Sequence, residues 1–364
     1  MILGQFLTCL APTILVLLQI FSSMDPGWYY IASAAGGIVS WISIALSSLS
    51  DVMPREWRAP MFGLLLSGFS LGFALSPIFA IFCSRLGVSL LSFTILFLSF
   101  LYSVFFLPET LSTEQAAEAR LQRSEYRMQE NESKFVCVSR SFVRPFKELL
   151  ILNRNNLFRL LSLLAFFSGM STSADQTLLI YYVEDRLGFN NQDIAILFGL
   201  IGIIGIFVQG VLLKIITDWV GERFVIVIAF TCGAITNTLY AFANTKGFIF
   251  FAVVVSSFTG MSFPTISAIK ANNAEESEQG RIQGALYALS SLASAVGPAI
   301  LRMAYQETKY TTQPGSFFLV ATGFYIVAVA CACALPKDKA NARRRDNEYD
   351  EISLVDSVNE TGFD

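Results

Sequence analysis

Residues 224–245 read FVIVIAFTCGAITNTLYAFANT, and no charged side chain interrupts this stretch between Arg223 and Lys246. A helix needs about 20 consecutive apolar residues to cross the hydrocarbon core of a lipid bilayer. The stretch is long enough to do so, and it therefore predicts a membrane-spanning helix.

The same pattern recurs along the chain. A further stretch, about 160–183, is equally long and contains one acid, Asp175. The other charge-free runs are 1–24, 26–50, 59–84, 86–108, 194–213, 247–269, 282–301 and 310–336. Together they predict an all-α, polytopic membrane protein of about ten transmembrane helices, four before a long polar stretch and six after it.

The composition agrees with a membrane protein and argues against several other classes. Hydrophobic residues make up 54% of the 364 residues and charged residues only 15%, where a soluble domain has about 25% charged. A formal net charge of −3 offers no basic surface to nucleic acid. The chain has no histidine, its cysteines suggest no metal site, and no nucleotide-binding or catalytic motif is present. We expect no enzyme activity, no metal and no cofactor.

Basic residues predict the orientation. With the N-terminus in the cytoplasm, 20 of the 25 lysines and arginines, Lys270 among them, fall in connections on the cytoplasmic side, as the positive-inside rule requires. Both termini are therefore expected in the cytoplasm, while the identity of the membrane stays open. The expected organisation is a four-span bundle, a cytoplasmic loop, a six-span bundle and a disordered tail, at 1–108, 109–156, 157–336 and 337–364.

The tail contains Tyr349-Asp350-Glu351-Ile352. This tyrosine-x-x-bulky pattern is of the kind that sorting adaptors recognise, although four-residue patterns also arise by chance. A sorting adaptor at Tyr349–Ile352 is accordingly a weak expectation.

Two predicted spans share an internal pattern. One carries Gly63, Gly68 and Gly72 before Pro77, and the other carries Gly284 and Gly297 before Pro298; the proline follows the first glycine by 14 residues in both. Such repeats are typical of secondary carriers, whose binding site lies between two halves near the midplane. We expect the glycines to be packing or rocking surfaces, and the prolines, with Pro264, to bend their helices.

Several segments resemble the major facilitator superfamily. They are the loop 51–58, the exit FLPET at 106–110, the segment SFPTISA at 262–268, QGRIQG at 279–284 and GPA at 297–299. Within that superfamily they look like the hippocampus-abundant-transcript-like branch, which is similar to tetracycline-resistance efflux proteins. The resemblance runs from about Gly4 to Pro336. It implies an inverted-repeat fold and a transporter of a small organic solute, driven by the solute gradient or by protons, that works by alternating access.

The chain also departs from the pattern of the family it resembles. Family members have twelve spans and this chain has ten, and its first span corresponds to the family's third. Ser76-Pro77 also stands where the family's antiporters have glycine-proline. The alternative function is therefore a truncated, non-transporting membrane protein, either a scaffold or an inactive product.

Asp175 is the one acid deep in a predicted span. An ionised carboxylate there is costly, so it should face a wet cavity or a partner, or take up a proton. Such a group suits proton-coupled transport, although a position near the outer leaflet would merely hydrate it. Gln176, Gln209 and Asn237 are further candidates for solute binding, with interhelical hydrogen bonding as the alternative.

Acids and bases in the short cytoplasmic turns are candidate gating charges. In the resembling family such turns hold the cytoplasmic side shut in one state, and the alternative is that they only set the topology. The candidates are Asp51 with Arg58, Asp218 with Arg223, and Glu278 with Arg281.

The predicted orientation can be tested at two sequons, Asn131-Glu132-Ser133 and Asn359-Glu360-Thr361. Both lie on the cytoplasmic side, so we expect neither asparagine to carry an N-linked glycan. Mass spectrometry of peptides from protein made in a eukaryotic host measures this directly. A glycan on Asn131 would contradict the orientation.

Overall fold

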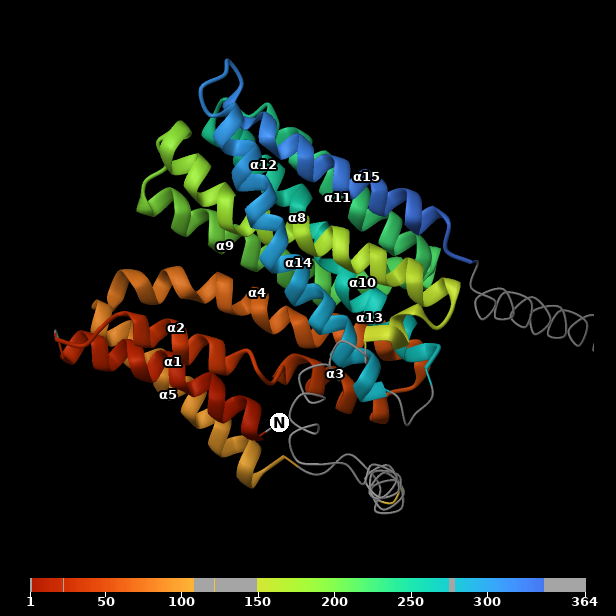
Figure 1. The fold of residues 1–364 in the computed structure, drawn as a ribbon, viewed down its shortest axis with the longest axis horizontal. Coiled ribbons are helices and arrows are strands. Elements are labelled where there is room, and N and C mark those ends of the chain that lie inside the picture. The colour runs from red at the N-terminus through yellow and green to blue at the C-terminus, as the bar shows by residue number, and fades with distance from the viewer. Residues whose placement is uncertain (1, 22, 108–120, 122–148, 275–278, 337–364) are drawn as a thin grey trace, which may run out of the picture.

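A computed structural model describes residues 2–21, 23–107, 121, 149–274 and 279–336. Glu278, Tyr349–Ile352 and both sequons lie outside these residues. Within them the secondary structure is helical (Figure 1). The helices are α1 (Ile2–Ile20), α2 (Gly27–Gly36), α3 (Trp41–Val52), η1 (Arg55–Trp57), α4 (Arg58–Phe82), α5 (Arg85–Phe105), η2 (Leu149–Asn153), α8 (Asn156–Leu187), α9 (Asn191–Phe207), η3 (Val208–Leu212), α10 (Leu213–Val220), α11 (Glu222–Ala241), α12 (Lys246–Ser256), η4 (Ser257–Met261), α13 (Ser262–Asn272), α14 (Gln279–Thr308), η6 (Pro314–Phe317) and α15 (Phe318–Cys333).

Ten helical stretches in the described part of the chain are long and apolar enough to span a membrane. Four precede the long polar stretch and six follow it, so the predicted number and grouping of spans are confirmed. The protein is an integral, multi-pass membrane protein.

The second span is broken, although its charge-free run predicted one continuous helix. α2 ends at Gly36 and α3 begins at Trp41, where the Ser40 Oγ accepts a hydrogen bond of 3.1 Å from the Ser43 amide. Adjacent glycines, Gly36 and Gly37, weaken the helix, and a serine N-cap begins a new one.

The N-terminal helices, α1 to α5, lie along one side of the C-terminal helices, α8 to α15 (Figure 1). α1 packs against α2 and α5, while α4 packs against α9 and α13. Only 11% of the α5 span is buried within the protein, compared with 50% of the α11 span. α5 is thus peripheral, and α4 provides much of the contact between the two groups.

Within the C-terminal helices, α8 packs against α14 and α15, and α11 packs against α12 and α15. The Tyr325 ring is fully buried and occupies the space beside Gly233, where a Cβ atom would lie 2.7 Å from the ring. The missing side chain of Gly233 therefore lets α15 approach α11 closely.

Glycines allow similarly close contacts at two other interfaces. A Cβ atom at Gly202 would overlap the Ala74 backbone, and one at Gly63 would lie 2.8 Å from the Gln209 carbonyl oxygen, so both belong to the contact of α4 with the α9–η3 segment. A Cβ atom at Gly297 would overlap the Met170 backbone between α14 and α8.

Not every predicted packing glycine has this role. A Cβ atom at Gly68, Gly72 or Gly284 would meet no atom within 4 Å, so none of these three packs closely against a neighbour in this structure; a role as rocking surfaces stays a prediction. Their spacing along the sequence could not show which side of the helix faces a neighbour. Pro77 and Pro298 lie inside α4 and α14, and Pro264 lies in the first turn of α13; the bends expected there stay a prediction.

Two glycines of α9 provide a matched test of the α4–α9 contact. Gly202→Ala would force the Ala74 backbone to shift and should destabilise the protein by about 1–3 kcal/mol. A Cβ atom at Gly199 would meet no atom within 4 Å. Gly199→Ala should therefore leave the stability of the protein unchanged or raise it, since alanine favours the helix. Thermal unfolding of both variants in one detergent measures the difference, and equal midpoints would contradict this packing.

Candidate functional site

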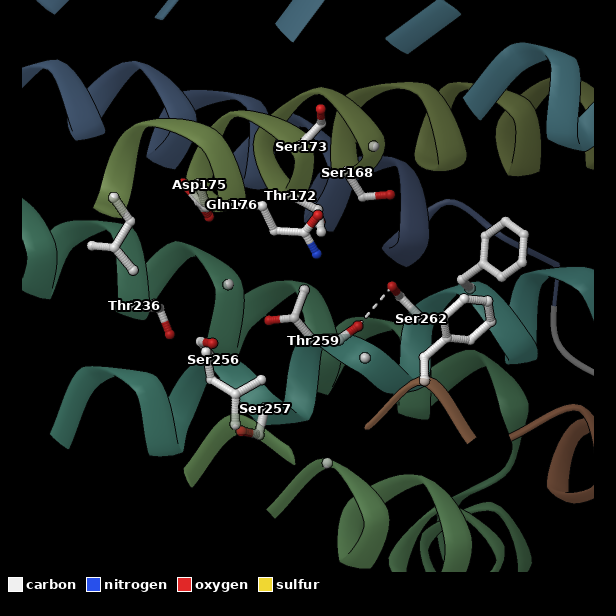
Figure 2. A pocket seen from close by; sticks show the side chains of 18 of the residues that line it. Ser168, Thr172, Ser173, Asp175, Gln176, Thr236, Ser256, Ser257, Thr259 and Ser262 are labelled. Carbon is white, nitrogen blue, oxygen red and sulfur yellow. Dashed lines mark hydrogen bonds between the residues drawn. The ribbon is translucent and has the colours of Figure 1, made fainter. Parts of the chain in front are cut away.

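A cavity of about 630 Å³ lies between α4 and the C-terminal helices. Residues of α4, α8, α9, η3, α11, α12, η4, α13, α14 and α15 line it. Figure 2 shows two opposite walls of this space, with Thr172, Asp175 and Gln176 on the α8 side and Thr259 of η4 on the other.

All four residues predicted to bind solute or protons line this cavity: Asp175, Gln176, Gln209 and Asn237. They come from three segments far apart in sequence, α8, η3 and α11. Their convergence could not be seen in the sequence, which placed each in a span but not on a common wall.

Asp175 and Asn237 contact one another across the cavity wall. The Asn237 Nδ2 donates a hydrogen bond of 2.9 Å to the Asp175 Oδ2 and one of 3.2 Å to the Gly233 carbonyl oxygen. Asn237 is fully buried, whereas Asp175 is only partly covered. The bond fixes the carboxylate, which is the one charged group among the described residues that line the cavity.

Helix α8 holds Asp175 on a rigid, well-capped element. The Asn155 Oδ1 accepts a hydrogen bond of 2.8 Å from the Phe158 amide at its start. Gly188 ends it with a φ of 62°, a left-handed conformation that favours glycine. Asp175 lies well inside this helix, far from the fraying ends.

Three polar atoms at the cavity are buried and have no hydrogen-bond partner among the described residues. They are the Asp175 Oδ1, the Asn237 Oδ1 and the Thr259 Oγ1. A buried polar atom without a partner costs about 1–3 kcal/mol. These three atoms thus keep unused hydrogen-bonding capacity in the cavity wall.

Gln209 reaches the cavity through an irregular stretch of helix. It lies in η3, a π-helical turn between α9 and α10. Its side chain packs over Gly260, where a Cβ atom would lie 2.7 Å from the Gln209 Nε2. π-helical turns occur frequently at functional sites, and here the turn directs an amide toward the cavity.

The hydroxyl groups that line the cavity were not among the residues predicted from the sequence. On α8, Ser168, Thr172 and Asp175 recur at helical spacing along one side, and the Thr172 Oγ1 lies 3.1 Å from the Tyr325 hydroxyl. That spacing was the available signal. The other hydroxyl-bearing serines and threonines of the lining are Ser70, Ser173, Thr236, Ser256, Ser257, Thr259, Ser262, Ser290 and Ser294.

An aromatic wall faces these polar groups from the side of α4. Phe69 and Phe73 of α4 line the cavity together with Phe198 of α9. The Phe73 and Phe198 rings stack, with centroids 5.6 Å apart and planes 13° from parallel. The cavity is thus amphipathic, with aromatic rings on one side and hydroxyls, amides and a carboxylate on the other.

Of the gating candidates, Arg58 makes the most extensive contacts. From the start of α4, its Nη2 donates to the Ser50 carbonyl oxygen at 2.9 Å, and its Nη1 donates to the Ala271 carbonyl oxygen at 2.9 Å and the Asn272 Oδ1 at 3.2 Å. The Asn272 Nδ2 in turn donates to the Arg55 carbonyl oxygen at 3.3 Å. Arg58 therefore ties the N-terminal helices to the end of α13, and we call these contacts the Arg58 latch.

A second contact joins the two groups at the same end. The Lys214 Nζ of α10 lies 3.3 Å from the ring centroid of Trp57 in η1. Asp51 lies near the end of α3 and Arg281 near the start of α14. None of the gating candidates in the described residues lines the cavity.

The pair predicted between Asp218 and Arg223 is not formed in the described residues. Arg223 instead donates to the carbonyl oxygen of Cys333, the last residue of α15. Carbonyl groups at a helix C-terminus lack partners within the helix and attract cations. Arg223 thus joins α11 to α15, and Asp218 is exposed.

Lys270 was counted among the loop charges, but it is fully buried in α13. Its Nζ donates a hydrogen bond of 3.1 Å to the Ser162 Oγ of α8. The charge pattern could not distinguish a lysine that ends a span from one that lies inside it.

Comparison with known proteins shows the family. The sequence model of the Major Facilitator Superfamily matches residues 1–298 and 211–356. The human "Hippocampus abundant transcript 1 protein" is 21% identical over 305 residues, which cover 82% of this chain and 58% of that protein. The "Tetracycline resistance protein, class E" of Escherichia coli is 23% identical over 290 residues, covering 79% of this chain and 67% of that protein.

The fold agrees with this match. The crystal structure of the human organic anion transporter MFSD10 superposes with a TM-score of 0.72 at 18% identity, covering 91% of this chain and 76% of that one. The chain spans little more than half the length of the human hippocampus abundant transcript relative. Its match to the family model over most of its length establishes that the chain belongs to the major facilitator superfamily, a family of transporters and not of enzymes.

Proposed function

We propose that the chain moves a small organic solute across a membrane by alternating access, with the cavity as the solute site. The convergence of Asp175, Gln176, Gln209 and Asn237 on one cavity supports this most strongly. At about 630 Å³ the cavity has the size of a small-molecule site. The human structural relative is an organic anion transporter, so anions belong in any panel of trial solutes.

Proton coupling is proposed at Asp175. No lysine or arginine of the described residues lines the cavity with it, and a lone ionised carboxylate within a membrane is costly. A proton neutralises the carboxyl group when no solute is bound. When a solute binds there, the proton passes to water of the cavity and the solute takes its place beside the carboxylate. The Asn237 Nδ2 stabilises the ionised form by donating to the Asp175 Oδ2.

The moving units are proposed to be 1–108 and 157–336, joined by the loop 109–156. Both termini and the Arg58 latch would then lie on the cytoplasmic side, and the tail 337–364 would follow the last span. Alternating access requires contacts that differ between two states. The Arg58 latch suits this, because it joins the two units through a few polar contacts distant from the cavity.

Asp175→Asn should abolish the pH dependence of transport, since an amide keeps the shape of the carboxyl but cannot exchange a proton. The measurement is uptake of a panel of labelled neutral, cationic and anionic solutes into proteoliposomes, with and without an imposed pH gradient. Glu184→Gln is the matched control, because Glu184 is exposed on the same helix and does not line the cavity.

Unchanged pH-dependent uptake in Asp175→Asn would contradict the coupling role. If no solute of the panel is transported by the unaltered chain, the result favours the alternative, a non-transporting membrane protein.

Arg58→Ala should favour the conformation in which the latched end is open. Loss of the charged donor removes three hydrogen bonds, and a cost of about 3 kcal/mol would raise the open population about a hundredfold. Spin labels at 52 and 273, on a background without the native cysteines, report the distance across this end.

Arg55→Ala is the matched control for the latch. Arg55 lies in the same turn and contributes only its backbone carbonyl to Asn272, which the substitution retains. An identical distance distribution for Arg58→Ala and Arg55→Ala would show that the latch does not hold this end closed.

A further inference from the structure

Among the fully buried lining atoms that lack a partner in the described residues, acceptors outnumber donors. Of the three partnerless buried atoms at its wall, the Asp175 and Asn237 Oδ1 atoms can only accept hydrogen bonds. The third, the Thr259 Oγ1, can accept or donate. A ligand that satisfies all three must therefore bring several donors of its own.

The charge of the cavity also favours a solute that carries hydrogen-bond donors and a positive charge. Asp175 is the one charged residue among the described residues that line it, and the buried cations Arg58 and Lys270 lie outside the lining. An anionic solute would meet a carboxylate and no compensating cation, which is costly in a medium of low dielectric constant. A cationic solute would meet a counter-charge.

The opposite wall accommodates an apolar body. Phe69, Phe73 and Phe198 present ring surface to the cavity. Aromatic faces attract cations and stack with other rings. The wall thus favours a solute with a ring system next to its charged group.

We infer that the transported solute is an organic amine, bound as its ammonium group at Asp175 with its aromatic body against Phe69, Phe73 and Phe198. A primary ammonium carries three N–H donors, and the carboxylate of Asp175 is the one counter-charge among the described residues that line the cavity. An alcohol of the same shape supplies one donor and a carboxylate none. The inference extends the proposed function by naming the solute class of the same cavity.

A matched set of three probes tests whether the cavity prefers an amine to an alcohol and a carboxylate of similar shape. The probes are 2-(2-naphthyl)ethylamine, the corresponding alcohol, and 3-(2-naphthyl)propionate. Binding to the full chain in detergent is measured by calorimetric titration. We expect the amine to bind about tenfold or more tightly than the alcohol, because charge-assisted hydrogen bonds are roughly twice as strong as neutral ones. The carboxylate should not bind measurably.

The variants locate the ammonium group. Asp175→Asn should weaken amine binding by about tenfold or more and leave alcohol binding within about twofold, since only the charge is removed. Thr259→Val, which keeps the shape of the side chain, should weaken binding of the amine by a smaller factor than Asp175→Asn does. Glu184→Gln, outside the cavity on the same helix, should change neither.

Three results would overturn the inference: a carboxylate that binds as tightly as the amine, an amine that does not bind, or amine binding that survives Asp175→Asn. Because binding is measured without transport, this outcome is separate from that of the proposed function. Tight, Asp175-dependent amine binding without uptake into proteoliposomes would count against transport alone.

Discussion

A lipid bilayer offers no water to backbone N–H and C=O groups, so each must find a partner within the protein. Regular helices meet this requirement by themselves, and irregular backbone is tolerated where it is buried in protein or lines a cavity. The chain follows this constraint in its C-terminal helices. The π-helical turn η3 and the 3₁₀ turn η4 interrupt two spans, and both line the same cavity.

Those two interruptions shape the site together. η3 carries Gln209 and η4 carries Gly260, and the amide of the first packs over the second. A regular helix at either position would rotate these residues relative to their neighbours, and a side chain at 260 would displace the amide. Within these two C-terminal spans, the irregular backbone thus lies at the cavity, where polar groups of the lining surround it.

Sequence patterns predicted the spans well, because the bilayer thickness fixes their length and charge interrupts them. They also selected the acid and the amides that line the cavity, since polar residues in a span stand out against 54% hydrophobic residues. The patterns did not give the direction in which a side chain points. That is why Gly68 and Gly72 were assigned to packing, Arg223 was paired with Asp218, and Lys270 was placed in a loop. The partners of Arg58 are backbone carbonyls, which no side-chain pattern reveals.

Helix α13 connects the cavity to the Arg58 latch. Its first residues, Ser262 and Phe263, line the cavity, and its last, Ala271 and Asn272, accept from Arg58. It has 11 residues and is about 16 Å long, and Pro264 in its first turn is the one position along it at which a bend is expected. Under the proposed mechanism, opening of the latch would displace the part of α13 beyond Pro264 as one body, and a solute that holds η4 and the start of α13 in place would resist that opening. One helix thus links the two sites, so the link does not require an extended chain of contacts.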